Sequence, residues 1–127
     1  GQTISTATNT VLTFDTENFD TDGTFSSNRF TPTVAGYYWC FGNFSLSGPV
    51  VDTNVVIYLK KNGVGAEPWG WGENDTIALS TETSIRTQAL IYLDADDYLE
   101  LVIFHTSGVD KTTVADRTYF GAWRMNV

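Results

Sequence analysis

Residues 30–47 read FTPTVAGYYWCFGNFSLS, and this stretch decides the fold. Residues 34–36 have the composition of a turn, and a long apolar segment follows at residues 37–47. Successive side chains of an extended strand point to opposite faces. One face of the segment carries Tyr38, Cys40, Gly42, Phe44 and Leu46, and the other carries Tyr37, Trp39, Phe41, Asn43 and Ser45. The segment therefore predicts a long β-strand with one face in a core.

Short strand-like segments lie on both sides of this stretch, separated by Gly, Asn, Asp and Pro. The predicted strands are residues 10–14, 29–33, 53–61, 77–80, 84–93, 98–105 and 119–127. Asn62 and Gly63 favour a tight hairpin turn. Residues 64–75 hold four glycines or prolines and predict a loop. Short strands with turn signals every 8–12 residues or so are typical of an all-β sandwich or barrel.

Length, charge and cysteine content bound the class of protein. The 127 residues support a single domain, residues 1–127, with one core. A net charge of −8 would repel a phosphate backbone, which excludes nucleic acid as a partner. No apolar run approaches the roughly 18 residues that span a bilayer. Cys40 is the only cysteine, so an internal disulfide is excluded and we expect Cys40 to be a small buried apolar residue.

Two predicted strands, residues 98–105 and 119–127, are apolar on both faces. A strand at the surface of a monomeric sandwich needs only one apolar face. Burying an aromatic side chain is worth about 1.5–3 kcal/mol, so several exposed ones would form a patch that monomers seldom carry. The pattern therefore predicts an interface between copies of the chain.

Four motifs occur in the order found in domains of the C1q and tumour necrosis factor (TNF) superfamily. FTPTVAGYY (30–38) resembles the phrase F-x-P-x-x-A-G-x-Y, and VIYLKKNG (56–63) resembles the strand that ends in K-N-G. LDADDYLEL (93–101) is similar to L-x-x-G-D-x-V-x-L, and TYFGAW (118–123) is similar to the closing s-F-x-G-f-l. Together the motifs extend the resemblance over nearly the whole chain.

Two residues depart from the family pattern. The glycine of the G-D corner is Asp96 here, and Asp tolerates a left-handed backbone better than most residues. We therefore expect Asp96 to adopt that conformation. The phenylalanine of the closing strand is Tyr119. Neither change alters the expected fold.

The resemblance implies a ten-stranded antiparallel jelly-roll sandwich that assembles as a homotrimer, with the inner sheet of each subunit facing its neighbours. The core residues expected from it are Tyr38, Phe44, Leu99, Leu101, Ile103, Tyr119 and Trp123. The residues expected to point towards the trimer are Tyr98, Glu100, Val102, Phe104, Phe120, Ala122 and Arg124. We expect Glu100 and Arg124 to pair across subunits, because an unpaired buried charge is strongly destabilising.

The sequence offers little catalytic chemistry. His105 is the only histidine, and Ser107 and Asp110 lie near it in sequence, but this spacing does not arrange a nucleophile, a base and an orienting acid. No cluster of Cys and His would hold zinc or iron. We therefore expect a protein that is not an enzyme.

Calcium is the ion that the acidic turns would suit, because Asp and Asn oxygens are the ligands of a hard cation. The candidate ligands are Asp94, Asp96 and Asp97, with a second group at Asp15, Asp20 and Asp22. The alternative is that these residues only keep the loops solvated.

The predicted loop at residues 64–75 carries the clearest binding signal. The candidate ligand-binding residues in it are Trp69, Trp71, Glu73 and Asn74. Tryptophan faces stack on the apolar faces of sugar rings, and carboxylates and amides form hydrogen bonds with hydroxyl groups. We therefore expect a surface glycan as the ligand. The alternative is that one or both tryptophans pack against the sandwich or a neighbouring subunit.

The acidic, Thr- and Asn-rich opening resembles C1q-like domains at the tips of bacteriophage fibres. The only methionine is Met125, so we expect the chain to be the C-terminal part of a longer protein. The resemblance implies the trimeric head of a fibre or spike on the virion, which binds a host-surface glycan or protein receptor, contacts other virion proteins and does not insert into a membrane. The alternatives are a structural virion protein without a receptor, namely a capsid decoration protein or a trimerisation knob, and a bacterial extracellular C1q-like binding protein.

Overall fold

The structure, a computed structural model, describes residues 1–48, 53–63, 69–76 and 81–126, and only the backbone of residues 73–76. Its strands are β1 (Thr3–Ile4), β2 (Thr10–Val11), β3 (Phe25–Ser26), β4 (Arg29–Phe30), β5 (Gly36–Ser47), β6 (Thr53–Lys61), β7 (Trp69–Thr76), β8 (Glu82–Leu93), β9 (Leu99–His105), β10 (Lys111–Thr112) and β11 (Tyr119–Arg124). A short 3-10 helix, η1 (Ala115–Arg117), precedes β11. The described part of the chain has no helix long and apolar enough to cross a membrane.

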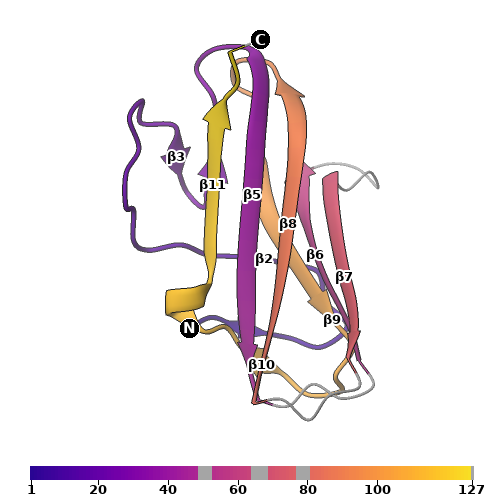
Figure 1. The fold of residues 1–127 in the computed structure, drawn as a ribbon. Helices are drawn as coiled ribbons and strands as arrows, with labels where there is room; N and C mark the ends of the chain where they lie inside the picture. The colour runs from indigo at the N-terminus through magenta and orange to yellow at the C-terminus, as the bar shows by residue number, and fades with distance from the viewer. Residues whose placement is uncertain (49–52, 64–68, 77–80, 127) are drawn as a thin grey trace.

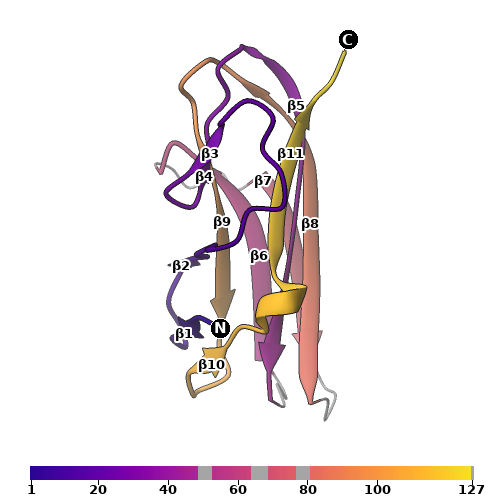
Figure 2. The ribbon, with the colours of Figure 1, turned by 90° about the vertical axis from the view of Figure 1, so that its left-hand side faces the viewer.

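The long strands form two antiparallel layers (Figure 1, Figure 2). The front sheet, nearest the viewer in Figure 1, has the order β11-β5-β8. The rear sheet has the order β3-β4-β9-β6-β7, with β2 also paired to β9, and β1 pairs separately with β10. The predicted all-β jelly-roll fold is confirmed. The described residues contain eleven strands instead of the ten expected, because the opening segment forms four separate strands of two residues each, β1 to β4.

Alternating side chains of the long strands fill the space between the two sheets. The residues of the core cluster on β5, β6 and β9 are Tyr38, Cys40, Phe44, Leu46, Val55, Ile57, Leu59, Leu99, Leu101 and Ile103. All the core residues predicted on β5 and β9 are confirmed. Cys40 is fully buried, and burial raises the pKa of its thiol to about 12. This cysteine is therefore an unreactive core residue, as expected.

A tight turn follows β6 and another follows β8, and hydrogen bonds from the Asn62 side chain connect the two turns. Asn62 and Gly63 have φ values of 54° and 62°, as an Asn-Gly hairpin turn requires. Asp96 has a φ of 73°, which confirms the expected left-handed conformation. The Asn62 amide donates to a carboxylate oxygen of Asp97 at 2.7 Å and accepts from the Tyr98 N–H at 2.8 Å. The two hairpin ends are thus held in one hydrogen-bonded unit.

Strand β7 lies in the segment that was predicted to be a loop. Its Gly70 and Gly72 approach β8 so closely that a Cβ at either position would lie 2.5 Å from Thr87 Oγ1 or from the Arg86 carbonyl oxygen. Glycine in a strand is needed where another backbone comes this close. The loop prediction was wrong for residues 69–75, because Gly70 and Gly72 permit close packing of a strand against β8, and residues 64–68 of that prediction lie outside the described residues. The strand predicted at residues 77–80 lies outside the described residues.

Candidate interaction surfaces

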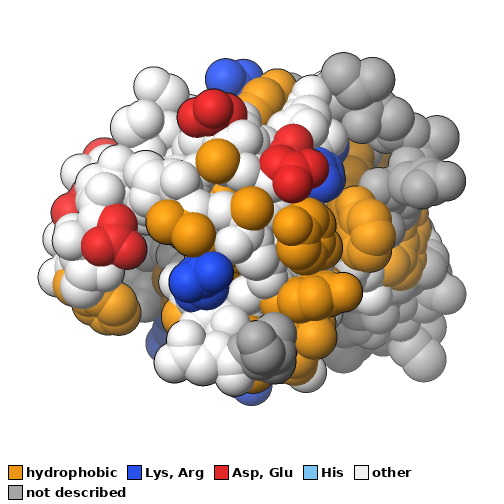
Figure 3. All heavy atoms as spheres, turned by 90° about the horizontal axis from the view of Figure 1, so that it is seen from above, with side chains coloured by type: hydrophobic (Ala, Val, Ile, Leu, Met, Phe, Trp, Pro, Cys, Tyr) orange, Lys and Arg blue, Asp and Glu red, His pale blue; other side chains and the backbone are white. Residues whose placement is uncertain are grey.

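A group of large apolar side chains lies on the outward side of the front sheet, away from the core. We call this group the aromatic face, and it consists of Tyr37, Trp39, Phe41, Leu90, Tyr92, Tyr119 and Trp123. Five of its members are 45–52% exposed, and the other two are half-buried. Figure 3 shows the end of the molecule that is at the top of Figure 1, where hydrophobic side chains lie together between the centre and the right of the view. An apolar surface of this kind is typical of contact with another macromolecule.

Strand register brings the rings of the aromatic face together. Trp123 lies opposite Trp39 in the pairing of β11 with β5, and their ring centroids are 6.4 Å apart. The Phe41 ring lies 5.5 Å from that of Trp123. Tyr37 and Tyr92, paired across β5 and β8, contact edge to face at 5.2 Å. The rings therefore form one surface that spans all three strands.

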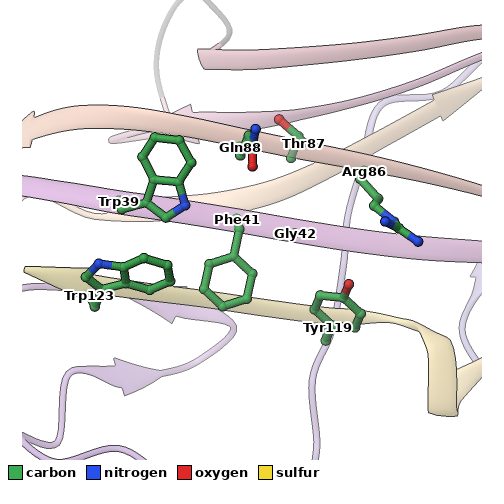
Figure 4. A pocket seen from close by; sticks show the side chains of 8 residues that line it. All are labelled: Trp39, Phe41, Gly42, Arg86, Thr87, Gln88, Tyr119 and Trp123. Atoms are coloured by element: carbon green, nitrogen blue, oxygen red, sulfur yellow. The ribbon is translucent and has the colours of Figure 1, made fainter.

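A shallow hollow of about 270 Å³ opens on the aromatic face (Figure 4). Its lining residues are Trp39, Phe41, Gly42, Arg86, Thr87, Gln88, Tyr119 and Trp123. Figure 4 shows the two tryptophans at one end of the hollow and Arg86 and Tyr119 at the other, with Phe41 between them. Gly121 permits this arrangement, because a Cβ at that position would collide with the Phe41 ring.

Asn43 is a buried polar residue beside the hollow. It lies opposite Arg86 on β8 and Tyr119 on β11, and it is 5% exposed. Its side-chain nitrogen donates to the Arg117 carbonyl oxygen, but its Oδ1 has no hydrogen-bond partner among the described residues. Leaving such an atom unsatisfied costs about 1–3 kcal/mol.

The predicted orientation of the last strand was wrong. Tyr119 and Trp123 were expected in the core but are 47% and 52% exposed. Phe120 and Ala122 were expected to face other subunits but pack against the core. The reason is register: paired residues of an antiparallel sheet share a face, and β11 aligns Trp123 with Trp39 on the outward side of β5.

The residues in and next to β9 that were predicted at the trimer interface lie on the rear sheet, not on the front sheet that carries the aromatic face. Strand β9 belongs to the rear sheet, so its outward residues Glu100, Val102 and Phe104, and Tyr98 just before the strand, are separated from the aromatic face by the core. Glu100 pairs with Arg29 of the same chain at 2.9 Å, and Arg124 donates to the Ala35 carbonyl oxygen at 3.1 Å. Within one chain these two side chains therefore have other partners, and a Glu100–Arg124 pair across subunits stays a prediction.

The structure describes the candidate ligand-binding residues only in part. Trp69 and Trp71 are 40% and 54% exposed, and the side chains of Glu73 and Asn74 lie outside the described residues. The Trp71 ring lies nearly parallel to that of Tyr58, with centroids 5.6 Å apart and an interplanar angle of 13°. The Tyr58 hydroxyl donates to the Asn9 side-chain oxygen at 3.3 Å, and burial raises the pKa of this phenol. Trp71 was predicted from the sequence, but Tyr58, its partner on β6, was not.

The acidic turn proposed as a calcium site binds donors from the protein itself. Asp97 accepts from the Lys61 ammonium at 2.7 Å, from the Asn62 amide and from the Asp94 N–H at 2.8 Å. Asp20, in the second candidate group, likewise accepts from the Phe25 N–H at 2.6 Å. Among the described residues, no three or more His, Cys, Asp or Glu side chains are grouped to hold a metal ion.

The donors around Asp97 predict a loss of stability in acid. The hydrogen bonds from Asn62 and then Lys61 lower the pKa of Asp97 to about 2. Because the folded pKa lies below that of the unfolded chain, the stabilisation is complete above about pH 4 and is lost as the pH falls towards 2. We expect Asp97→Asn to destabilise the fold by about 1–2 kcal/mol at pH 7, after allowance for solvent screening, and to flatten this acid response.

Urea unfolding at pH 7, 4, 3 and 2 measures this acid response. Asp116→Asn, which removes an exposed carboxylate in η1, is the matched control and should leave the pH profile unchanged. If Asp97→Asn follows the unmodified chain between pH 4 and 2, the turn does not depend on this carboxylate.

His105 has a structural environment. It is fully buried, and its Nε2 lies 3.0 Å from the Ile4 carbonyl oxygen. Its Nδ1 lies 2.9 Å from Ser107 Oγ, which donates in turn to the Val109 carbonyl oxygen. Asp110 accepts from the Thr6 N–H at 3.3 Å and does not orient the imidazole. The three residues are therefore not arranged as a catalytic triad, and His105, the last residue of β9, lies in the core.

No family model matches the chain, and no curated protein sequence matches it. Among solved structures, the globular domain of zebrafish complement 1qA protein is similar, with 18% identity over 98% of this chain and 91% of that chain and a TM-score of 0.65. Murine APRIL is similar at 14% identity over 79% of this chain and 72% of that chain, with a TM-score of 0.59. Eiger TNF from S. frugiperda is similar at 14% identity over 76% and 64%, with a TM-score of 0.53.

These similarities and the two-layered topology define the class of fold. The chain is a C1q/TNF-like jelly roll. At 14–18% identity the comparison establishes the fold alone, so function has to be argued from the surfaces of this chain.

Proposed function

We propose that the chain is a non-catalytic head domain that assembles as a homotrimer through the aromatic face. The observation that carries the proposal is the exposure of five large apolar side chains, at 45–52%, on one side of the front sheet. Burying each of them fully against a neighbour would contribute about 1.5–3 kcal/mol.

Light scattering coupled to gel filtration tests the assembly. We expect a mass of about 42 kDa, three times the 14.0 kDa of one chain. The aromatic face should be covered in this state, so tryptophan fluorescence should shift to the red on dilution to monomer. A mass of 14 kDa at micromolar concentration would overturn the proposal.

The proposed location of this head is the tip of a bacteriophage fibre or spike. The resemblance of the acidic opening segment to such heads supports it. Charge also supports an outward position for the other surfaces, since three chains of net charge −8 carry −24 in all. Density for the domain at appendage tips is the expected result. Density on capsid faces would favour the decoration protein instead, and the absence of the domain from virions would favour the bacterial extracellular protein.

Receptor binding is the second part of the proposed role. If the aromatic face joins the subunits, the outward side of the rear sheet stays in contact with solvent and carries Trp71. We expect labelled trimer to bind cells of the host through this side. A trimer that remains in virions but binds no host cell would favour the purely structural role.

A further inference from the structure

One large apolar side chain, that of Phe19, lies outside both the core and the aromatic face. It is 85% exposed, more than any other large hydrophobic residue in the described part of the chain. The segment between β2 and β3, which carries it, extends beyond the edge strand β11, at the left in Figure 1. Burial of this ring would therefore require another molecule.

The chain holds the base of the loop that carries Phe19. We call residues 15–24 the Phe19 loop. Just before it, the Phe14 ring packs edge to face on the Phe25 ring, with centroids 6.0 Å apart. Directly after Phe19, the Asp20 carboxylate accepts a hydrogen bond from the Phe25 N–H at 2.6 Å. A side chain on an ordered base loses less conformational freedom when it binds, so the loop is preorganised for a contact.

The hollow of the aromatic face has the size and the lining that a phenyl ring requires. An apolar cavity of about 150 Å³ is sufficient to bind benzene in another protein, and this hollow measures about 270 Å³. Figure 4 shows Phe41 at its centre, between Trp123 and Tyr119. Aromatic rings pack favourably on one another when they are offset or meet edge to face. The hollow can therefore accept the phenyl ring of another copy of the chain.

The Phe19 loop carries only negative charge. It contains four carboxylates and neither Lys nor Arg. Glu17 and Asp22, on either side of Phe19, are exposed. The ring is thus flanked by carboxylates that a cation on a partner surface would attract.

The hollow offers a cation of this kind. Arg86 lines it and is exposed, and no carboxylate in the described part of the chain lies within ion-pair distance of the guanidinium. Glu82, the other charged residue on the outward side of β8, pairs with Arg117 at 2.7 Å. Arg86 is therefore complementary in charge to the Phe19 loop.

We propose that Phe19 of each subunit inserts into the hollow of the next subunit, where Glu17 and Asp22 lie against Arg86. The inference specifies the contact between subunits and rests on the homotrimer proposed above. In Figure 1 the front sheet faces the viewer while the Phe19 loop extends to the left, so one subunit can offer its loop to one neighbour and its hollow to the other. A head-to-tail contact of this kind generates a ring when the rotation between subunits closes.

The monomer–trimer equilibrium of Phe19→Ser, measured by analytical ultracentrifugation, tests the insertion. Because the ring is 85% exposed in the subunit, the free energy of unfolding should be nearly unchanged. We expect the concentration at which half of the chains are trimeric to rise about tenfold or more. The matched control is Val109→Ser, at a residue that is 59% exposed in the loop after β9, and it should change this concentration less than about twofold.

Two added cysteines test which surfaces meet. Asn18→Cys places a thiol next to Phe19, and Gln88→Cys places one in the lining of the hollow, while the native Cys40 is fully buried. With both substitutions in one chain, a short bismaleimide should give a covalent product of about 42 kDa, and each single variant should remain at 14 kDa. A double variant that also remains at 14 kDa would overturn the proposal, because the loop would then not reach the hollow of another chain.

Charge reversal tests the ion pairs. Arg86→Glu should weaken assembly about tenfold, and Glu17→Lys with Asp22→Lys in the same chain should restore it. A triple variant that assembles no better than Arg86→Glu would overturn the pairing of the loop with Arg86.

Light scattering of the unmodified chain separates this proposal from the proposed function. A mass of 14 kDa would overturn the homotrimer and the insertion together. A mass of about 42 kDa with an unchanged equilibrium for Phe19→Ser would overturn the insertion alone and leave the trimeric head intact.

Discussion

Trp123→Glu is expected to dissociate the proposed trimer, so that the mass in solution falls from about 42 kDa to about 14 kDa. The Trp123 ring contacts Trp39 and Phe41 at the centre of the aromatic face. Replacing it removes about 1.5–3 kcal/mol of apolar burial per subunit and buries a carboxylate in its place. Summed over three subunits, the free energy of assembly should fall by about 10 kcal/mol.

The folded subunit should tolerate this substitution, because Trp123 is 52% exposed on an edge strand. Circular dichroism should therefore show an unchanged β-sheet spectrum. The matched control is Val109→Glu, which places the same charge at a residue that is 59% exposed in the loop after β9. This control should remain at about 42 kDa. A Trp123→Glu protein that also remains there would show that the aromatic face does not join the subunits.

The sequence was sufficient to predict the parts of the fold that depend on strict alternation and turn chemistry. Along residues 37–47 one parity combines Cys40 and Gly42 with large apolar residues, and this parity is the core side of β5. The left-handed Asp96 and the turn at Asn62 follow from local backbone preferences, so they were also predicted. Strand β7 could not be recognised, because its glycines are explained only by the nearness of β8 in space.

The surfaces were less predictable because they depend on register between distant strands. Residues 119–124 are apolar at both parities, so alternation alone could not show which side faces the core. Alternation also could not predict the ion pair between Arg29 and Glu100 on the rear sheet, because these residues are 71 positions apart in sequence. One signal was available: Tyr37, Trp39 and Phe41 lie on the non-core parity of β5, and three aromatic residues on that parity already indicate a covered face.

Phe120→Ala is expected to destabilise the isolated subunit by about 2–4 kcal/mol. Phe120 packs against the core and forms an aromatic cluster with Phe25 at 5.5 Å and Phe14 at 6.1 Å. The cluster fixes the opening segment against β11, so truncation should leave a cavity and loosen that segment. Replacing the neighbouring Tyr119, which is 47% exposed, by alanine should lower the free energy of unfolding by less than about 1 kcal/mol.

These two substitutions are best compared by urea unfolding in a Trp123→Glu background, where stability does not depend on protein concentration. In the unmodified background, we expect the substitution at residue 119 to affect trimer assembly more than the substitution at residue 120. Tyr119→Ala should weaken trimer formation, because Tyr119 lines the hollow of the aromatic face, and Phe120→Ala should leave the affinity between subunits nearly unchanged. The opposite result, with Tyr119 controlling stability and Phe120 controlling assembly, would mean that β11 turns its other side to the core. Since adjacent residues of one strand are compared, differences in position, length or exposure of the strand cannot account for either outcome.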